Sequence, residues 1–487
     1  MKALSLSFII IAVLMLLIMV VISFTFFGLW LSEIGLWFSW IPLTFLIVSI
    51  PFLIQMVDDI HLRIDFFLML ISSIFNLITY IRMMIPFLSI RRTNQKFQKI
   101  MKQSLGENYL AYIDPSIRSR FFKSVNFKLS HYFKGINERR LNKVVSSIEQ
   151  ITYRKIGETE IKLNTYFPKR SVINPIIIFI HGGGWMQGSK DQGKNEKAAK
   201  LLASYGYSVF NIDYRLSTPD FLTKKGTPHD STTIREMVSD VRSAIIFAKK
   251  NAQNYKGNPD EIFLFGRSAG AHLALLTAFS CEQKYFDMEA VECSIEDMEL
   301  VGVIAFYPIT DLEELYEFYD KTNPLRLALL QGTGGELEKY RNLYKIFSPI
   351  NYITEETAEM IPPIFLAAGK YDKVVDVYQS EELFEEFQKY KIPSVYLELP
   401  WANHSFDHIL SGPGGQLVYK YLTQFLVWSL SRKKMIEIEK LAADLGIEDI
   451  ISTKKIEILH ANKGEKILLK NHLLNYSNKI NDYKKKS

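Results

Sequence analysis

Cysteine is scarce in this chain: only Cys281 and Cys293 occur among its 487 residues. Two cysteines exclude a fold held together by several disulfide bonds, and they suit a reducing compartment. Histidine is also sparse, with nine residues, and neither an H-E-x-x-H motif nor a cluster of Cys and His occurs, so neither a metal site nor another cofactor is expected. Hydrophobic residues nevertheless make up 48% of the chain, which excludes a disordered or collagen-like protein.

Charge is missing from much of the N-terminal region. No charged side chain occurs in residues 3–32 or in residues 34–57, and a third apolar run, Phe66–Ile81, ends at Arg82. About 20 apolar residues in a helix cross the hydrocarbon core of a bilayer, so the first two runs are long enough, and the third becomes so if Arg82 reaches the interface. A secretory signal peptide would have a shorter apolar run, of about 7–15 residues, followed by a small-residue cleavage site that does not occur here.

These runs predict two or three transmembrane helices, over residues 4–31, 36–57 and 64–88. The third run has an alternative interpretation as a buried hairpin or an interfacial helix. Lys and Arg crowd the end of the last run, so the body that follows is expected in the cytoplasm, in a multi-pass membrane protein. The N-terminus would then lie outside with three spans and inside with two.

Basic residues are distributed unevenly over the rest of the chain. Residues 91–150 and 433–487 are rich in Lys and Arg, whereas residues 151–432 carry a net negative charge. A nucleic-acid-binding protein carries its basic patch on the folded domain, so no nucleic-acid partner is expected. The basic flanks suit anionic membrane lipid, and solvated charge explains them equally well. We therefore expect a transmembrane region (1–90), a basic connector (91–150), a folded domain (151–432) and a basic C-terminal extension (433–487).

Short β-like runs alternate with helix-like runs in the folded domain. One of them, Ile176–Ile180, is apolar on both faces, as expected for a parallel sheet covered by helices on each side. The pattern predicts an α/β fold with three layers and a mostly parallel sheet. The predicted strands are Ile161–Phe167, Pro175–Ile180, Ser208–Ile212, Glu261–Phe265, Val301–Phe306, Ile364–Ala368 and Ser394–Leu399, and the predicted helices are Asn195–Tyr205, Ile234–Gln253 and Gln379–Lys389.

A G-x-S-x-G motif, Gly266-Arg267-Ser268-Ala269-Gly270, follows one of these strands and opens a helical run. A tight strand–turn–helix needs small residues on both sides of the serine, and it exposes the hydroxyl at the end of the sheet. The helix N-terminus behind the serine favours developing negative charge. On its own, the motif is equally consistent with an ordinary glycine-flanked helix start.

A second glycine-rich loop, His181-Gly182-Gly183-Gly184-Trp185, ends another predicted strand. Consecutive glycines let backbone N–H groups approach a ligand, as an oxyanion hole requires. The alternative of a phosphate-binding loop is disfavoured, because no Gly-Lys-Ser/Thr follows.

An acid and a histidine follow the serine in the order that a Ser–Asp–His triad of this kind requires. Asp372 and His404 each lie just past the end of a predicted strand. Asp376 and His408 are rival candidates, but they lie farther past the same strand ends, and Asp311 is a more distant rival.

With these motifs, and with Asp213-Tyr214-Arg215-Leu216 and Gly257-Asn258-Pro259-Asp260, residues 150–430 resemble α/β-hydrolases of the hormone-sensitive-lipase-like and carboxylesterase group. Within that group the chain is most similar to arylacetamide deacetylase, kynurenine formamidase and isoprenylcysteine methylesterase-like proteins. The resemblance is specific for the fold and poorly specific for the substrate. It implies a nucleophile (Ser268), a base (His404), an orienting acid (Asp372) and an oxyanion hole made of backbone amides (Gly183, Gly184 and Ala269).

The sequence therefore predicts a membrane-anchored serine hydrolase of the carboxylesterase type, which cleaves a small or lipid-like ester through an acyl-enzyme. The alternatives are an amidase, formamidase or acyltransferase with the same triad, a non-catalytic membrane scaffold, and an envelope deacetylase outside the cell. Ser217–Glu236 and Leu312–Tyr344 are expected to cover the pocket, as an apolar acyl site or as surface packing. Arg267, beside the serine, either steers a carboxylate-bearing substrate or has a side chain that is packed or solvated.

Overall fold

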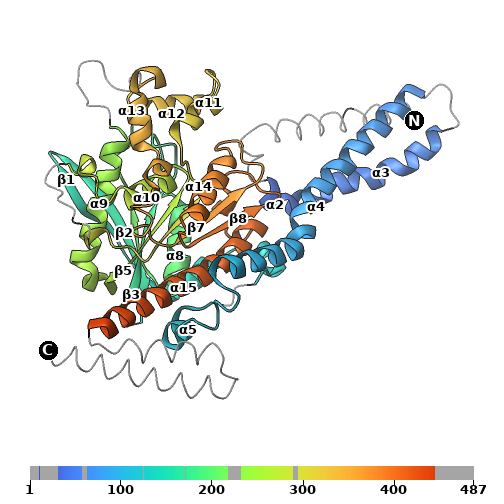
Figure 1. Ribbon diagram of the computed structural model, residues 1–487. Coiled ribbons are helices and arrows are strands. Elements are labelled where there is room, and N and C mark those ends of the chain that lie inside the picture. The colour runs from blue at the N-terminus through green and yellow to red at the C-terminus, as the bar shows by residue number, and fades with distance from the viewer. Residues whose placement is uncertain are drawn as a thin grey trace.

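The protein is built around one eight-stranded sheet with the strand order β1-β2-β4-β3-β5-β6-β7-β8 (Figure 1). The strands are β1 (Val145–Ile156), β2 (Thr159–Pro168), β3 (Asn174–Ile180), β4 (Ser208–Ile212), β5 (Gly257–Arg267), β6 (Gly302–Phe306), β7 (Ile364–Gly369) and β8 (Ser394–Leu399). The computed structural model describes residues 10, 31–57, 63–123, 126–170, 172–217, 232–288, 294 and 296–444.

Six neighbouring strands pair in parallel, in the order β4-β3-β5-β6-β7-β8. β1 and β2 form an antiparallel hairpin, and β2 also pairs antiparallel with β4. The predicted α/β-hydrolase fold with a mostly parallel sheet is therefore confirmed. β1 was not predicted, because half of the residues of this edge strand are exposed and the strand lacks an apolar alternation.

Two hydrophobic cores lie on opposite faces of the sheet, and β3 contributes to both. Its residues Ile176, Ile178 and Ile180 belong to one core, and the intervening Ile177 and Phe179 belong to the other. The alternation explains why this strand is apolar on both faces, since side chains of a strand point to opposite faces in turn. Burial of each such side chain stabilises the fold by about 1.5–3 kcal/mol.

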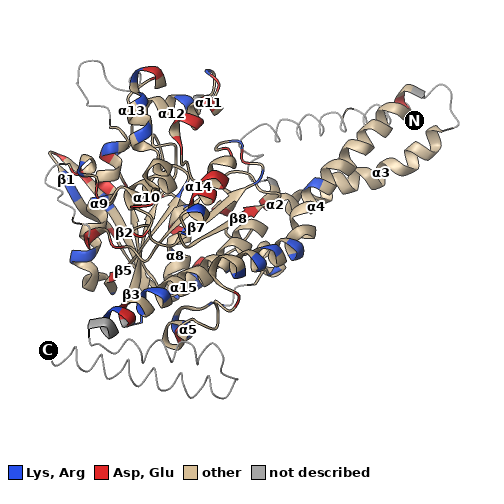
Figure 2. Cartoon of the chain, in the orientation of Figure 1, with Lys and Arg blue, Asp and Glu red and all other residues tan. Residues whose placement is uncertain are grey.

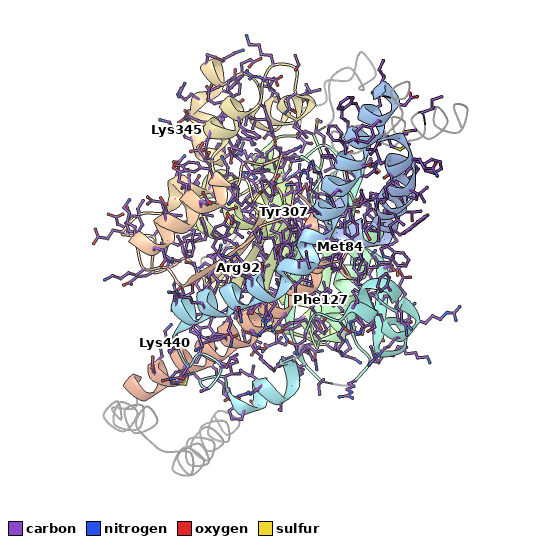
Figure 3. The ribbon with its side chains drawn as sticks, turned by 90° about the vertical axis from the view of Figure 1, so that its right-hand side faces the viewer. Met84, Arg92, Phe127, Tyr307, Lys345 and Lys440 are labelled. Carbon is purple, nitrogen blue, oxygen red and sulfur yellow. The ribbon has the colours of Figure 1, made fainter. Side chains whose placement is uncertain are left out.

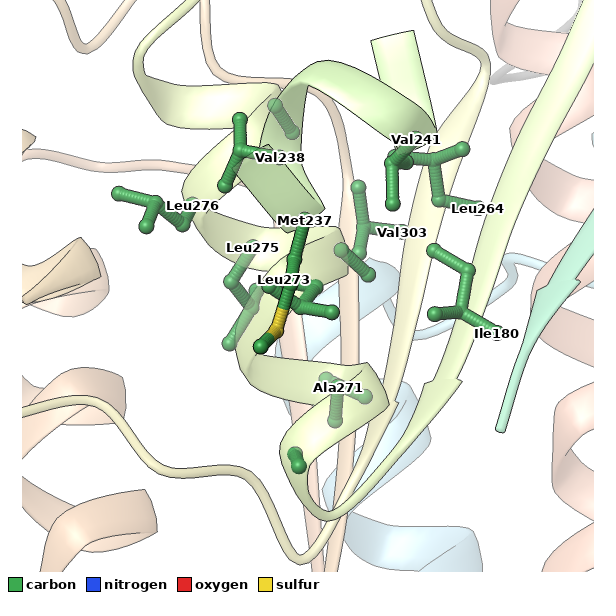
Figure 4. Packing of buried hydrophobic residues seen from close by; sticks show 14 of the residues in the cluster. Ile180, Met237, Val238, Val241, Leu264, Ala271, Leu273, Leu275, Leu276 and Val303 are labelled. Carbon is green, nitrogen blue, oxygen red and sulfur yellow. The ribbon is translucent and has the colours of Figure 1, made fainter. Parts of the chain in front are cut away.

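Helices cover both faces. In the first core, α9 (Ile234–Asn251) and α10 (Ala269–Phe279) pack on the sheet through Met237, Val241 and Leu273 (Figure 4). α14 (Tyr378–Lys389) adds to the same face, and α8 (Gly193–Ser204) and α15 (Pro413–Asp444) cover the other face.

Two N-terminal helices form a hairpin that projects from the body: α3 (Trp40–Met56) and α4 (Arg63–Leu105) (Figure 1). The Ser73 hydroxyl donates to the Ser49 hydroxyl between them, at 2.8 Å, and both side chains are buried. Small polar residues at such a contact let two apolar helices approach closely. The outer surface of the hairpin is apolar, with exposed Ile47, Ile50, Ile54, Ile64, Phe67, Ile71, Ile74 and Ile78.

Among the described residues, one helix is long and apolar enough to cross a membrane, the segment Ile64–Leu105 of α4. The count becomes two if Ser32–Phe38 and Trp40–Met56, which meet at a bend of 45°, form one span. The predicted third span, 64–88, falls inside α4, and the predicted second span, 36–57, falls on α3 and its neighbour α2 (Leu31–Phe38). The predicted first span, 4–31, lies almost entirely outside the described residues.

The segment expected as a basic connector packs closely against the body. α4 continues past the hairpin, and Phe97 and Met101 near its end are fully buried in the second core. Three short helices follow: α5 (Pro115–Phe121), α6 (Leu129–Lys134) and α7 (Glu138–Val144). The Asp114 carboxylate caps α5 and also accepts a hydrogen bond from Lys434 of α15, at 2.9 Å. Residues 445–487, most of the predicted extension, lie outside the described part of the chain.

Candidate active site

Ser268 lies in a sharp turn between β5 and α10. Its backbone is strained, with φ of 53° and ψ of −124°, and its N–H donates to the Phe306 carbonyl at 2.9 Å. A side chain at Gly266 would place its Cβ 2.2 Å from the Gly270 carbonyl oxygen, and one at Gly270 would lie 2.3 Å from the Ile180 carbonyl oxygen. The two glycines are therefore required for strand and helix to meet closely enough to form this turn.

His404 connects the serine to an acid. Its Nε2 lies 3.0 Å from Ser268 Oγ, and its Nδ1 lies 2.7 Å from Asp372 Oδ2. The imidazole and the carboxylate are almost completely shielded from solvent, with side-chain exposures of 7% and 2%. The structure thus brings together the three side chains that the sequence analysis selected. In this arrangement the His404 imidazole can accept the proton of the Ser268 hydroxyl, and Asp372 orients the imidazole.

The second oxygen of Asp372 has partners of its own. Oδ1 accepts the backbone N–H groups of Val374 at 2.8 Å and Val375 at 2.9 Å. These bonds fix the carboxylate so that Oδ2 faces His404. Asn403, which the sequence analysis passed over, ties the two loops together, because its Oδ1 accepts the N–H groups of Lys373 at 3.0 Å and His404 at 2.7 Å.

The glycine loop lies directly against the serine turn. A Cβ at Gly182 would lie 2.7 Å from the Arg267 carbonyl oxygen and 3.2 Å from Ser268 Cβ. Gly183 and Gly184 have positive φ values of 139° and 59°, and no backbone carbonyl in the described part of the chain accepts their amides. Ala269 begins α10, where N–H groups lack intrahelical acceptors. The arrangement suits donation of backbone hydrogen bonds to an oxyanion beside Ser268.

The rival residues have other roles. The Asp376 carboxylate accepts the Tyr378 N–H at the start of α14, and the Asp311 carboxylate caps α11 (Leu312–Phe318). His408 Nδ1 lies 3.5 Å from Lys194 Nζ. The Ser268 hydroxyl is instead in contact with His404.

Arg267 is packed, which contradicts the idea that it steers a substrate. Its side chain is 1% exposed, and its guanidinium pairs with the Asp407 carboxylate at 2.5 Å. Burial lowers the pKa of Arg267, but the adjacent carboxylate outweighs this effect and holds that pKa above its usual range. The Tyr307 hydroxyl donates to the same carboxylate at 2.6 Å, and the Tyr307 ring lies against His404, with ring centroids 4.4 Å apart. This network joins the serine turn to the histidine loop.

A second histidine, His272, lies one helical turn beyond the serine and is fully buried. Burial lowers its pKa to about 4, although a hydrogen bond to the Phe347 carbonyl opposes this effect. Its Nδ1 accepts the Trp185 indole N–H at 3.3 Å, so its Nε2 carries the hydrogen that reaches the Phe347 carbonyl at 2.7 Å. His272 is therefore neutral and fully engaged in packing the glycine loop against α10.

Three helices gather beyond one end of the sheet (Figure 1): α11, α12 (Pro324–Thr333) and α13 (Leu337–Phe347). A Cβ at Gly184 would lie 3.6 Å from Ala328 Cβ, which places α12 over the glycine loop. Leu329 is fully buried. Within the segment Leu312–Tyr344, α12 thus lies against the glycine loop, whereas residues 218–231, most of the other expected cover, lie outside the described residues.

No group of His, Cys, Asp and Glu that could hold a metal ion occurs within the part of the chain that the structure describes. The groups gathered around Ser268 are a hydroxyl, an imidazole, a carboxylate and backbone amides.

Residues 163–387 match the family model BD-FAE. Over 236 residues the chain is 29% identical to the "Probable carboxylic ester hydrolase LipM" of Mycobacterium tuberculosis, covering 48% of this chain and 49% of that protein. It is 27% identical to "Esterase LipC" of the same organism, covering 51% of this chain and 58% of that protein. It is 29% identical to the "Probable isoprenylcysteine alpha-carbonyl methylesterase ICMEL1" of Oryza sativa, covering 47% of this chain and 50% of that protein. The chain spans about half the length of these relatives.

Proposed function

We propose that the protein is a serine hydrolase of the carboxylesterase group of the α/β-hydrolases and that it cleaves a carboxylic ester. The match of residues 163–387 to the family model BD-FAE and the similarity to named ester hydrolases support this proposal. The observation that carries the proposal is the distance of 3.0 Å between Ser268 Oγ and His404 Nε2. A serine hydroxyl is a weak nucleophile until a neighbouring base removes its proton, and this contact places the base within reach.

In the proposed mechanism, Ser268 Oγ forms a bond to the ester carbonyl carbon while its proton passes to His404 Nε2. Asp372 holds the ring orientation and stabilises the imidazolium that results. The carbonyl oxygen becomes an oxyanion and accepts the amides of Gly183, Gly184 and Ala269.

The tetrahedral intermediate then collapses to an acyl-enzyme. The bond from the carbonyl carbon to the alcohol oxygen breaks, and the alcohol leaves with the proton from His404. A water molecule repeats the sequence: His404 accepts its proton, its oxygen bonds to the acyl carbon, and the acid is released as Ser268 Oγ recovers the proton.

The full-length protein in detergent is expected to hydrolyse at least one member of the series p-nitrophenyl acetate, butyrate, octanoate and palmitate. The ester that is hydrolysed fastest reports the length of acyl chain that the site accepts. The p-nitroacetanilide amide serves as a comparison, and an amide rate above all ester rates would favour the amidase. A rate equal to that of buffer on every ester, with no labelling by a fluorophosphonate probe, would favour a non-catalytic scaffold.

We also propose that the α3–α4 hairpin crosses the membrane and that the body lies on the cytoplasmic side, where it meets an apolar or lipid-derived ester. The support is the apolar outer surface of the hairpin and the series of basic residues that begins where α4 reaches the body, including Arg91, Arg92, Lys96 and Lys99 (Figure 2). Such residues remain on the cytoplasmic side and attract anionic lipid.

The membrane proposal predicts that the protein stays in the membrane pellet after alkaline carbonate extraction. It also predicts that a protease added to intact cells leaves the body whole and cleaves it once the cells are opened. Release by carbonate would contradict the anchor. Cleavage in intact cells would place the body outside and favour the envelope alternative.

A further inference from the structure

Glu33 is the only charged side chain between Ala3 and Val57. A carboxylate inside so apolar a region is expensive unless it has partners, and such residues are retained for a role. The triad and the hairpin packing leave this residue unexplained.

The structure places Glu33 in a socket on the body. The side chain comes from α2, is fully buried, and accepts two hydrogen bonds: Oε2 from the Gly414 N–H at 2.8 Å, and Oε1 from the Trp401 indole N–H at 3.3 Å. Gly414 lies in the first turn of α15, where N–H groups have no helical acceptor and a negative charge is favoured. Glu33 therefore supplies, from another part of the chain, an acceptor that α15 needs.

Glycines make room for this carboxylate. A Cβ at Gly412 would lie 2.4 Å from Glu33 Oε2, and a Cβ at Gly414 would lie 2.8 Å from Glu33 Oε1. A side chain at either position would therefore force the Glu33 carboxylate out of the place that it occupies. The glycine-rich run Ser411–Gly415 is thus shaped to receive Glu33.

The remainder of α2 is docked beside the socket. A Cβ at Gly35 would lie 3.2 Å from the backbone of Met83, so α2 packs closely on α4, which crosses the body in Figure 3. Trp37 packs against α6, with its ring centroid 5.2 Å from that of Phe133 and 6.3 Å from that of Tyr132. The docked position of α2 therefore rests on apolar contacts in addition to the two hydrogen bonds.

The socket adjoins the loop that carries His404. Trp401, which donates to Glu33, lies three residues before His404, and the Ala402 carbonyl between them accepts the Tyr371 N–H at 2.9 Å, next to Asp372. The loop Trp401–His404 is thus bounded by Glu33 on one side and by the triad on the other.

We propose that Glu33 is a positioning residue. It docks α2 onto the loop Trp401–His404 and so holds the His404 imidazole within hydrogen-bond distance of the Ser268 hydroxyl. The inference rests on the proposed function, because it assigns to Glu33 an effect on the reaction of that triad. Displacement of a catalytic group by about 1 Å can lower the rate on the order of 10²-fold. A small shift of the loop would therefore produce a measurable loss of rate.

The test compares full-length wild type, Glu33→Ala and Glu33→Gln in the same lipid bilayer. The matched control is Ser39→Ala, which removes a buried hydroxyl whose bond goes to the nearby Leu36 carbonyl. Docking is measured by hydrogen exchange of peptides that cover residues 411–416. Positioning is measured by kcat and KM on the best p-nitrophenyl ester, with active sites counted by a fluorophosphonate probe.

We expect faster exchange at residues 411–416 in Glu33→Ala than in wild type or Ser39→Ala. We expect kcat per labelled site to fall about 10- to 100-fold, with KM within about threefold, and formate or acetate to restore part of the rate by occupying the socket. A merely structural role would reduce the number of labelled sites and leave kcat per site unchanged. Glu33→Gln keeps the shape of the side chain, so we expect its exchange rate and its kcat per labelled site to lie between those of wild type and Glu33→Ala. This variant also tests the proposal if Glu33→Ala does not fold.

Each contrary result is decisive. Unchanged exchange in Glu33→Ala would overturn the docking, and faster exchange with unchanged kcat per site would overturn the positioning role. Failure of wild type both to hydrolyse esters and to label Ser268 would instead refute the proposed function, and hydrogen exchange would still decide the docking.

Discussion

Replacement of Ser268 by alanine is expected to lower kcat for ester hydrolysis by about 10⁶-fold, because the variant has no oxygen that can form the acyl-enzyme. The small residual rate would come from the oxyanion hole and from substrate binding. The measurement is hydrolysis of the best p-nitrophenyl ester, together with loss of fluorophosphonate labelling.

Ser243→Ala is the matched control for this variant. Its hydroxyl lies on α9 and donates to the Ser239 carbonyl at 2.8 Å, away from the site. This control should retain wild-type kcat. A Ser268→Ala rate within tenfold of wild type would show that another nucleophile performs the reaction.

Asp372→Asn is expected to lower kcat by about 10⁴-fold, with little change in stability. The reason lies in the partners of this side chain. Its Oδ1 accepts two N–H groups, from Val374 and Val375, so an asparagine would keep its oxygen there and turn its NH₂ toward His404. Nδ1 of His404 would then have to accept a hydrogen bond, and the ring hydrogen would move to Nε2. In that tautomer His404 has no lone pair with which to take the proton of Ser268.

Asp376→Asn tests the same chemistry at the rival acid. Asp376 accepts the Tyr378 N–H at 3.1 Å, a bond that an asparagine oxygen can also accept, so kcat should remain within about twofold of wild type. The measurement is kcat for both variants at several pH values. Equal losses in the two variants, or none in Asp372→Asn, would contradict the assignment of the orienting acid.

The central strands could be predicted from the sequence because burial on both faces leaves uninterrupted apolar runs such as Ile176–Ile180. β1 could not be predicted, since its register is irregular between Ile148 and Ile151 and half of its residues are exposed to solvent. The packing of the predicted connector against the body could not be predicted for a similar reason. Phe97 and Met101 are buried by contacts with distant residues, and local periodicity carries no information on such contacts.

At the candidate site, the joint occurrence of the serine motif, the glycine loop and a later acid and histidine selected Ser268, because a sharp turn and a close backbone approach both demand glycine at set spacings. Asp372 and His404 could be selected from their places after strand ends. The pairing of Arg267 with Asp407 could not, because it joins residues that are adjacent only after folding. Tyr307 follows the end of β6, so a systematic inspection of strand ends would have found it.

The bond between Glu33 and Gly414 spans 381 residues of chain, which has a consequence for biosynthesis. At about 5–20 residues per second, a ribosome needs roughly 20–80 s to proceed from one partner to the other. Throughout that interval the N-terminal helices are already emerging while the turn that receives the carboxylate does not yet exist. Helix α2 thus reaches its final place late, after translation has passed residue 414, and a chain terminated earlier would retain an unpartnered acid in its most apolar region.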